Sequence, residues 1–345
     1  MSNRREEVLK HLKRKTDQMA DQPIPSELFD PITFNECMNI AKDLVVPKML
    51  FSEFWYEGEV SILFANTNLG KSILAVQIGD SISSGRPIDG LKMEAEKRRV
   101  LYFDFELSLK QLEARYSQNY TNHYRFDDDF IRVTLLSDLS FPDSIDFEDY
   151  LCQELENLAA EMKAKVLIID NLTHLKNETE RAKDALPLMK RLKNMANRHG
   201  LSILVIAHTP KRDAARPLSN NDLQGSKMLS NFCDSAFAIG KNLKDKHLRY
   251  IKQVKQRMTA ELYDGENVFV CELTKGEHDN FTGFKFLEMG YEYEHLRQFD
   301  EISKEERNPL ILKMHKERKS SRVIGEEIGL SHTAVQKILD KLRKT

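Results

Sequence analysis

Short apolar runs and longer segments with helical spacing alternate along the middle of the chain. The apolar runs, each of the length of a buried strand, are Val60–Phe64, Val100–Phe105, Ile131–Leu135, Val166–Asp170 and Ile203–Ala207. Apolar residues three and four positions apart predict helices near residues 71–84, 108–119, 146–163 and 183–198. The alternation predicts an α/β fold in which helices cover both faces of a mostly parallel sheet.

Two further strands follow this region. They are predicted at Arg249–Val254 and Val268–Thr274, and the polar residues 264–267 between them are typical of a turn. This pair predicts an antiparallel extension of the sheet.

The pattern divides the chain into four parts. Residues 1–54 form a helical segment that we expect to cover one edge of the core. Residues 55–289 hold the α/β domain, and the charged residues 290–306 are typical of a linker. Residues 307–345 have the spacing of a small all-α domain.

The segment between the first predicted strand and the first predicted helix reads Ala65-Asn66-Thr67-Asn68-Leu69-Gly70-Lys71-Ser72. A tight loop that leads into a helix directs backbone N–H groups at an anion, and the helix dipole favours negative charge there. Ala65 stands where the usual phosphate loop has its first glycine. We expect residues 65–72 to bind ATP, with Lys71 on the β- and γ-phosphates and the Ser72 hydroxyl on Mg²⁺.

Asp170 ends a buried strand, and open α/β sheets bind their ligands at that edge. It fits the second carboxylate directed at Mg²⁺, although such an aspartate can also cap the next segment. Because Asn171 follows it, the attacking water needs a base from elsewhere. Glu106 ends the predicted strand that follows the phosphate-loop helix and is the candidate, with Asp104 as its competitor and helix capping as the alternative.

Three further polar groups have candidate roles around this edge. His208 ends a strand, where it can hydrogen-bond the γ-phosphate or simply belong to a turn. Lys255 and Arg257 follow another strand, where they can stabilise a neighbouring subunit's phosphate or protect an exposed sheet edge. The polar loop 211–227 carries Lys211, Arg212 and Arg216, which can follow a nucleic-acid backbone; incidental charge in a disordered loop is the alternative.

Together these segments resemble the RecA-like hexameric ATPases, in the branch of RepA-type plasmid helicases and DnaB replicative helicases. The resemblance covers about residues 55–275 and includes the Glu106 segment, the strand that ends in His208-Thr209, the Gly225-Ser226 element and the Lys255-x-Arg257 pair. It implies a RecA-like P-loop core, a homo-oligomer in the form of a hexameric ring, and a Lys255–Arg257 pair that acts in trans.

The last residues resemble a helix-turn-helix domain. Ile324, Ile328, Val335 and Leu339 have the spacing of a helical core, and Ser331 can cap the last helix. Such a domain implies a recognition helix over residues 332–343 that contacts DNA. Its groove-facing residues would be His332, Thr333, Gln336 and Lys337, while Lys341, Arg343 and Lys344 would face phosphates. A three-helix oligomerisation module is the alternative.

Charge and composition sharpen this prediction. The chain has a net charge of −2, but residues 307–345 carry +6, which favours DNA as the partner of the tail. The four cysteines form no zinc-binding pattern. No run approaches the roughly 18 apolar residues of a membrane span, and no signal peptide is apparent, so we expect a cytoplasmic protein without membrane contact.

The sequence therefore predicts an ATP-hydrolysing, DNA-binding protein, as in a replication-type helicase or DNA motor of a mobile element or plasmid. An ATP-dependent DNA-binding regulator that unwinds nothing is the alternative.

Overall fold

The computed structural model describes residues 31–136, 147–171, 185–209, 212–213, 215–223, 226–275, 279–296, 304–328 and 330–343. The chain forms two units, Met1–Val46 and Pro47–Thr345. In the first unit, α2 (Phe34–Lys42) begins with a capping box, in which Thr33 and Glu36 bond each other's backbone N–H groups. No residue of α2 is buried.

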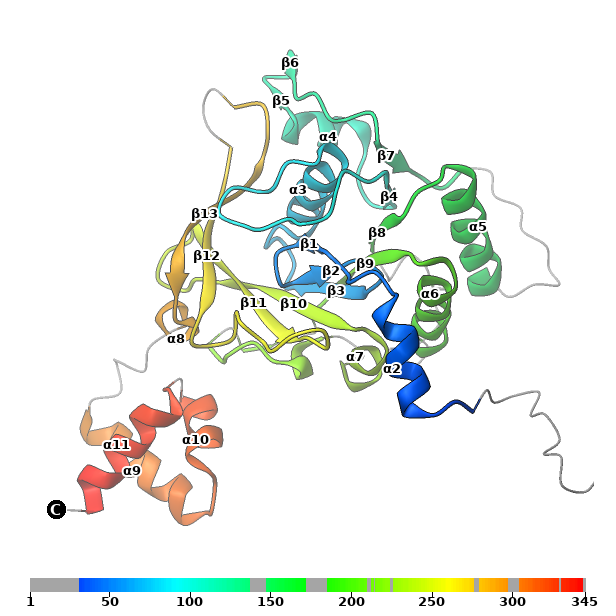
Figure 1. Cartoon of the computed structure of the whole chain (residues 1–345). Coiled ribbons are helices and arrows are strands. Elements are labelled where there is room, and N and C mark those ends of the chain that lie inside the picture. Colours follow the sequence, from blue (N-terminus) through cyan, green and yellow to red (C-terminus); the bar gives the residue numbers. More distant parts are fainter. Residues whose placement is uncertain are drawn as a thin grey trace, which may run out of the picture. The chain divides into compact units, whose positions relative to one another are not determined.

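A nine-stranded sheet is the framework of the second unit, in the order β13-β12-β11-β10-β3-β9-β8-β4-β7 (Figure 1). Neighbouring strands are parallel from β10 to β7. These strands are β3 (Val60–Ala65), β4 (Val100–Asp104), β7 (Phe130–Val133), β8 (Val166–Asp170), β9 (Ser202–His208) and β10 (Ser235–Lys241). The predicted mostly parallel sheet is thereby confirmed.

Three antiparallel strands extend the sheet beyond β10. They are β11 (Leu248–Lys255), β12 (Val268–Thr274) and β13 (Gly283–Gly290). The sequence predicted β11 and β12 but not β13 or β10. The buried strand β10 is composed largely of small residues, so its apolar signal is weak.

Side chains alternate between the two faces of the sheet, as the two-residue repeat of a strand requires. Leu63 of β3 packs toward α3 (Lys71–Ser84) on one face. Phe64 packs on the opposite face, in the core shared with α5 (Phe147–Glu161) and α6 (Ala185–His199). Figure 1 shows α3 and α6 on opposite sides of the sheet, as predicted.

Short elements complete this body. They are β1 (Met49–Phe51), β2 (Trp55–Tyr56), α4 (Leu109–Arg115), β5 (Ser117–Gln118), β6 (Asn122–His123), the 3-10 turn η3 (Asn220–Asp222), α7 (Ser226–Phe232) and α8 (Glu292–His295). The β1–β2 and β5–β6 pairs are antiparallel and lie outside the large sheet. Because α7 begins at Ser226, the predicted structureless loop 211–227 was too long.

Two predicted boundaries were also displaced. The body begins before residue 55, since Leu50, Phe51 and Phe54 are buried in its core. It also extends through α8 into the predicted linker 290–306, because Glu292 accepts hydrogen bonds from Lys252 (2.5 Å) and Tyr250 (3.1 Å). Both corrections arise from contacts between residues far apart in sequence.

The tail consists of α9 (Lys304–Lys316), α10 (Ser321–Ile328) and α11 (His332–Arg343). It has its own core of Ile311, Met314, Ile324, Ile328, Val335 and Leu339. Ser331 caps α11 as predicted, since its hydroxyl accepts the Ala334 N–H at 3.1 Å. At Gly325 an added Cβ would stand 2.4 Å from the Leu330 carbonyl oxygen, so the close turn between α10 and α11 requires glycine.

Candidate active site

The predicted phosphate loop lies between β3 and α3, at the carboxyl edge of the parallel strands. Gly70 has a φ of 97°, and an added Cβ would stand 2.9 Å from the Phe284 ring, so this position excludes larger residues on two grounds. The Lys71 amine curls back over the loop and donates to the carbonyls of Ala65 (3.0 Å) and Asn66 (3.3 Å). The loop is therefore tight, and Lys71 lies against its backbone at the start of α3.

Lys71 and Asp170 form the charged floor of the site. Lys71 is 8% exposed, and this burial lowers its pKa, while the carboxylates of Asp170 and Glu106 oppose the shift. Asp170 is 1% exposed, and burial raises its pKa, although hydrogen bonds from Ser72 and Tyr102 favour the charged form. The Tyr102 hydroxyl donates to Asp170 at 2.7 Å and fixes its orientation.

Glu106, Asn171 and His208 converge beside this floor from the ends of three neighbouring strands. The Asn171 amide donates to the Glu106 carboxylate and lies 3.1 Å from His208 Nε2. The Glu106 carboxylate is 3.9 Å from the same His208 nitrogen. The side chains of Glu106 and His208 remain about one third exposed, so a water molecule can approach them.

Asp104 belongs to a different set of contacts. Its carboxylate accepts the N–H groups of Glu106 (3.1 Å) and Leu107 (2.9 Å). Its other oxygen accepts Arg132 Nε at 2.8 Å, and Arg132 also donates to the Leu107 carbonyl at 2.5 Å. Because its side chain is fully buried and engaged, Asp104 holds the turn that carries Glu106. We call Asp104 and Arg132 the turn clamp.

The residues present fit a magnesium nucleotide. The described residues contain no cluster of three or more acidic, histidine or cysteine ligands for a metal ion. Mg²⁺ in nucleotide sites takes one or two protein oxygens and completes its shell with phosphate and water. Ser72 and Asp170 offer such oxygens, and the buried Asp170 carboxylate has a deficit of positive charge that a cation would relieve.

Lys255 and Arg257 lie at the opposite edge of the sheet. Lys255 is paired with Ala236, near the start of β10 and β3, whereas the phosphate loop follows the end of β3. The Lys255 amine donates to the carbonyls of Ser230 and Cys233, and Arg257 donates to the Asn231 carbonyl at 2.8 Å. Both side chains thus hold the end of α7, and neither reaches its own phosphate loop.

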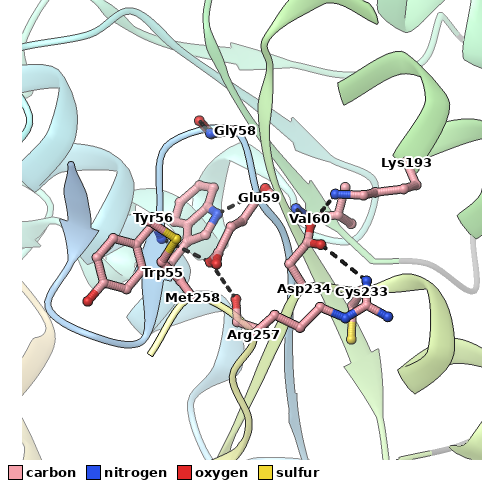
Figure 2. Close-up of polar contacts among 12 residues, drawn as sticks. Trp55, Tyr56, Gly58, Glu59, Val60, Lys193, Cys233, Asp234, Arg257 and Met258 are labelled. Carbon is pink, nitrogen blue, oxygen red and sulfur yellow. Dashed lines mark hydrogen bonds and ion pairs between the residues drawn. The ribbon is translucent and has the colours of Figure 1, made fainter. Parts of the chain in front are cut away.

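Figure 2 shows how Arg257 is anchored. Its guanidinium is 3.5 Å from Asp234, whose carboxylate also accepts Lys193 (2.5 Å) and the Val60 N–H (2.9 Å). Glu59 lies beside this group and accepts the Tyr56 N–H at 3.1 Å. The amino edge of the sheet is therefore an ionic network.

The three cations of the predicted DNA-contacting loop differ in their surroundings. Lys211 lies outside the described residues. The Arg212 side chain is 10% exposed, and its Nε atom is 3.0 Å from Asp222, so a DNA contact would require this ion pair to open. Arg216 is exposed and remains available for a phosphate.

The tail places its predicted DNA residues on one helix. His332, Thr333, Gln336 and Lys337 are all exposed on α11, while Val335 and Leu339 face the tail core. This division follows the helical repeat. The side chains of Lys341 and Arg343 and all of Lys344 lie outside the described residues.

Sequence reasoning missed Tyr102, Arg132 and the hydrogen-bonding role of Asn171. Tyr102 carried a signal, because it lies two positions before Asp104 on β4, and the two-residue repeat of a strand places both side chains on one face. Arg132 carried none, since its partner lies on the adjacent strand and 28 positions away in sequence.

The fold and the site define a P-loop ATPase with a RecA-like core. A family model described as "AAA domain" matches residues 34–214, just over half of the chain, and the chain belongs to that family. No curated protein matches the chain in sequence. Within the described residues, no helix is long and apolar enough to cross a membrane.

One solved structure among those with a similar fold is a KaiC-like protein from the hyperthermophilic archaeon Pyrococcus horikoshii. It is 14% identical, and the match covers 67% of this chain and 91% of that protein with a TM-score of 0.46. A likeness this distant carries no inference about function.

Proposed function

We propose that the protein hydrolyses ATP to drive movement on DNA, as a replication-type helicase or DNA motor of a mobile element or plasmid, and that it works as a hexameric ring. The proposal joins three parts: a hydrolysis site, a residue pair that acts between subunits, and a DNA-binding tail.

The hydrolysis step rests on the group formed by Glu106, Asn171 and His208. A water molecule attacks the γ-phosphorus, Glu106 accepts its proton, and the bond to the β-phosphate oxygen breaks to release ADP and phosphate. Asn171 orients the Glu106 carboxylate, and His208 hydrogen-bonds the γ-phosphate. Lys71 neutralises charge on the β- and γ-phosphates. Mg²⁺, held by Ser72 and Asp170, would withdraw electron density from the phosphate oxygens.

The ring is supported by the position of Lys255 and Arg257. Two cations at the sheet edge opposite the phosphate loop cannot serve the nucleotide of their own subunit. In a head-to-tail assembly this edge of one subunit faces the nucleotide edge of the next, where both cations would stabilise the developing charge.

The proposal of DNA binding depends on one observation, the exposed face of α11. It presents His332, Thr333, Gln336 and Lys337 together, on a three-helix domain whose other face is packed. Side chains of this kind on a helix that follows a capped turn suit the edges of bases in a major groove. Arg216 would add a phosphate contact from the ATPase body.

Strand displacement tests the motor. Full-length protein is incubated with ATP and a forked DNA duplex that carries a fluorophore and a quencher. We expect strand separation that requires ATP hydrolysis and is absent in Lys71→Ala. ATP-dependent assembly on DNA without strand separation would instead favour the regulator that unwinds nothing.

A further inference from the structure

A cavity of about 280 Å³ lies beneath α4, between that helix, α3 and the strands β4 and β7. We call it the α4 cavity. Most of its lining is apolar or aromatic: Val76, Leu112, Tyr116, Tyr124, Phe126 and Phe130. It does not include Lys71, Ser72, Asp170 or Glu106, so it is not the phosphate site.

Aromatic rings surround this cavity in a packed arrangement. Tyr116 and Phe126 are 5.2 Å apart at nearly perpendicular planes, and Phe126 and Phe130 are 5.6 Å apart. The Tyr124 hydroxyl donates to Asp80 and the Tyr102 hydroxyl donates to Asp170. These two tyrosines therefore direct their polar atoms to protein partners and leave ring surface for a ligand, which favours an aromatic occupant.

The charged groups of the cavity are already matched. Asp104 is paired with Arg132 at 2.8 Å, and Glu113 is paired with Lys110 at 2.5 Å and with His123 at 3.0 Å. A charged ligand would lose its hydration and find no free counter-charge among these groups, whereas a neutral ligand avoids that cost.

We propose that the α4 cavity is a binding site for a small, neutral, planar molecule of one or two fused aromatic rings. An apolar cavity of about 150 Å³ accepts a single benzene ring, and the α4 cavity is nearly twice that size. Apolar walls with a few polar groups at the margin are typical of small-molecule sites.

The floor of the cavity gives the ligand a route to catalysis. Asp104 and Arg132 both line the cavity, and together they form the turn clamp that holds the backbone of Glu106 and Leu107. A ligand that contacts Asp104 or Arg132 changes how rigidly the turn clamp holds the backbone of Glu106. Occupancy therefore acts on the rate of hydrolysis rather than on ATP affinity. This part rests on the proposed role of Glu106, whereas binding itself does not.

Binding is tested with full-length protein and indole as the probe, by isothermal titration calorimetry. We expect indole to bind, and indole-3-carboxylate and tryptamine to bind at least about fivefold more weakly because both are charged. No heat of binding, or tighter binding of either charged probe, overturns the proposal. Displacement of indole by ADP also overturns it, because the cavity would then hold the nucleotide base.

Two substitutions on the same helix locate the probe. Leu112→Trp fills the cavity and should weaken indole binding at least about tenfold, while Leu109→Trp adds the same ring at a position that is 72% exposed and should bind normally. Equal binding by both variants overturns the site. If Leu112→Trp fails to fold, photocrosslinking with a diazirine-substituted indole decides: labels must fall on Val76 or within residues 102–132, which hold the cavity lining.

The link to catalysis has a separate readout. Saturating indole should change kcat for ATP hydrolysis at least about twofold, with KM for ATP unchanged, and Leu112→Trp should abolish the response. Indole that binds without any change in kcat overturns the link and leaves the binding site standing. If Glu106 is not the base, the hydrolysis rate of Glu106→Gln without indole will show it. Failure of the proposed function and failure of the indole effect are therefore distinguishable.

Discussion

At the scale of single residues, the chemistry of the site depends on which carboxylate is exposed to water. Asp104 and Glu106 lie two positions apart, and alternation alone places both on one side of the strand. The contacts separate them: Asp104 is enclosed by Arg132 and two backbone N–H groups, while Glu106 is partly exposed and meets Asn171.

Glu106→Gln should retain ATP binding and lose about a hundredfold or more in turnover, because the water loses its base. Steady-state hydrolysis and nucleotide binding by calorimetry measure the two quantities. Glu113→Gln, which removes a carboxylate from the neighbouring helix, is the control. A silent Glu106→Gln together with a damaging Asp104→Asn would assign the base to Asp104.

Arg132→Ala should lower kcat about 10- to 100-fold with little change in KM, because the turn that carries Glu106 loses its clamp. Millimolar guanidinium should restore part of the rate, which a merely structural loss would not permit. Arg99→Ala is the matched control, since Arg99 pairs with Asp129 near the other end of β4. Equal losses in both variants would contradict a positioning role for Arg132.

At the scale of elements, β11 and α7 place Lys255 and Arg257 at the edge of the sheet opposite the phosphate loop. From there neither side chain can contact the nucleotide bound by the same subunit. Lys255 and Arg257 cap the carbonyl end of α7 in the same chain. A role in the neighbouring site would require these bonds to be exchanged for phosphate, which links the end of α7 to the nucleotide state of the next subunit.

Arg257→Ala should reduce turnover about a thousandfold, the scale of a lost arginine finger, while each subunit still binds ATP. Mixing Arg257→Ala subunits with Lys71→Ala subunits should restore some hydrolysis. It occurs at interfaces where the first variant supplies an intact phosphate loop and the second supplies an intact Arg257. Lys193→Ala, which removes another cation from the Asp234 network, should remain active. Full activity of a monomer would exclude action in trans.

Lys337→Ala on α11 should weaken binding to all duplex sequences and reduce the slope of log K against log salt by about one unit. Gln336→Ala should instead lose sequence preference. Lys319→Ala removes the same charge from a residue paired with Glu327 and serves as the control. Identical salt slopes in the Lys337 and Lys319 variants would make the tail a protein-interaction module.

At the scale of the whole molecule, the amino edge of the sheet contains a buried carboxyl that links folding to pH. Burial raises the pKa of Glu59 to about 7, although hydrogen bonds from the Tyr56 N–H and the Ser235 hydroxyl oppose this shift. The folded protein therefore holds a proton on Glu59 that the unfolded chain releases near its ordinary pKa.

Because the folded pKa is the higher one, the stability contributed by protonated Glu59 is complete below about pH 4.5 and is lost as the pH rises toward 7. Glu59→Gln should remove this dependence and gain roughly 3 kcal/mol relative to the native protein at pH 8, since each unit of pKa shift corresponds to about 1.4 kcal/mol. Urea unfolding at pH 5 and pH 8 measures it, with Glu57→Gln, a partly exposed neighbour, as the control. Parallel pH profiles for the two variants would contradict a raised pKa.

The sequence by itself determined the parallel sheet, the phosphate loop and the packed tail. These features depend on local chemistry: apolar runs of strand length, a Gly-Lys-Ser turn into a helix, and core spacing around Ser331. Each feature depends on residues that are neighbours along the chain. For that reason the predicted bounds of β8, β12 and α11 agree with the structure.

Only the tertiary structure decided which polar groups meet. The contact of Asn171 with Glu106, the clamp by Arg132, the inward turn of Arg212 and the α4 cavity all join residues from different strands or loops. Such contacts depend on the order and register of the strands, which apolar periodicity does not encode. The sequence could therefore place Glu106 at a strand end, whereas only the assembled sheet could distinguish it from Asp104.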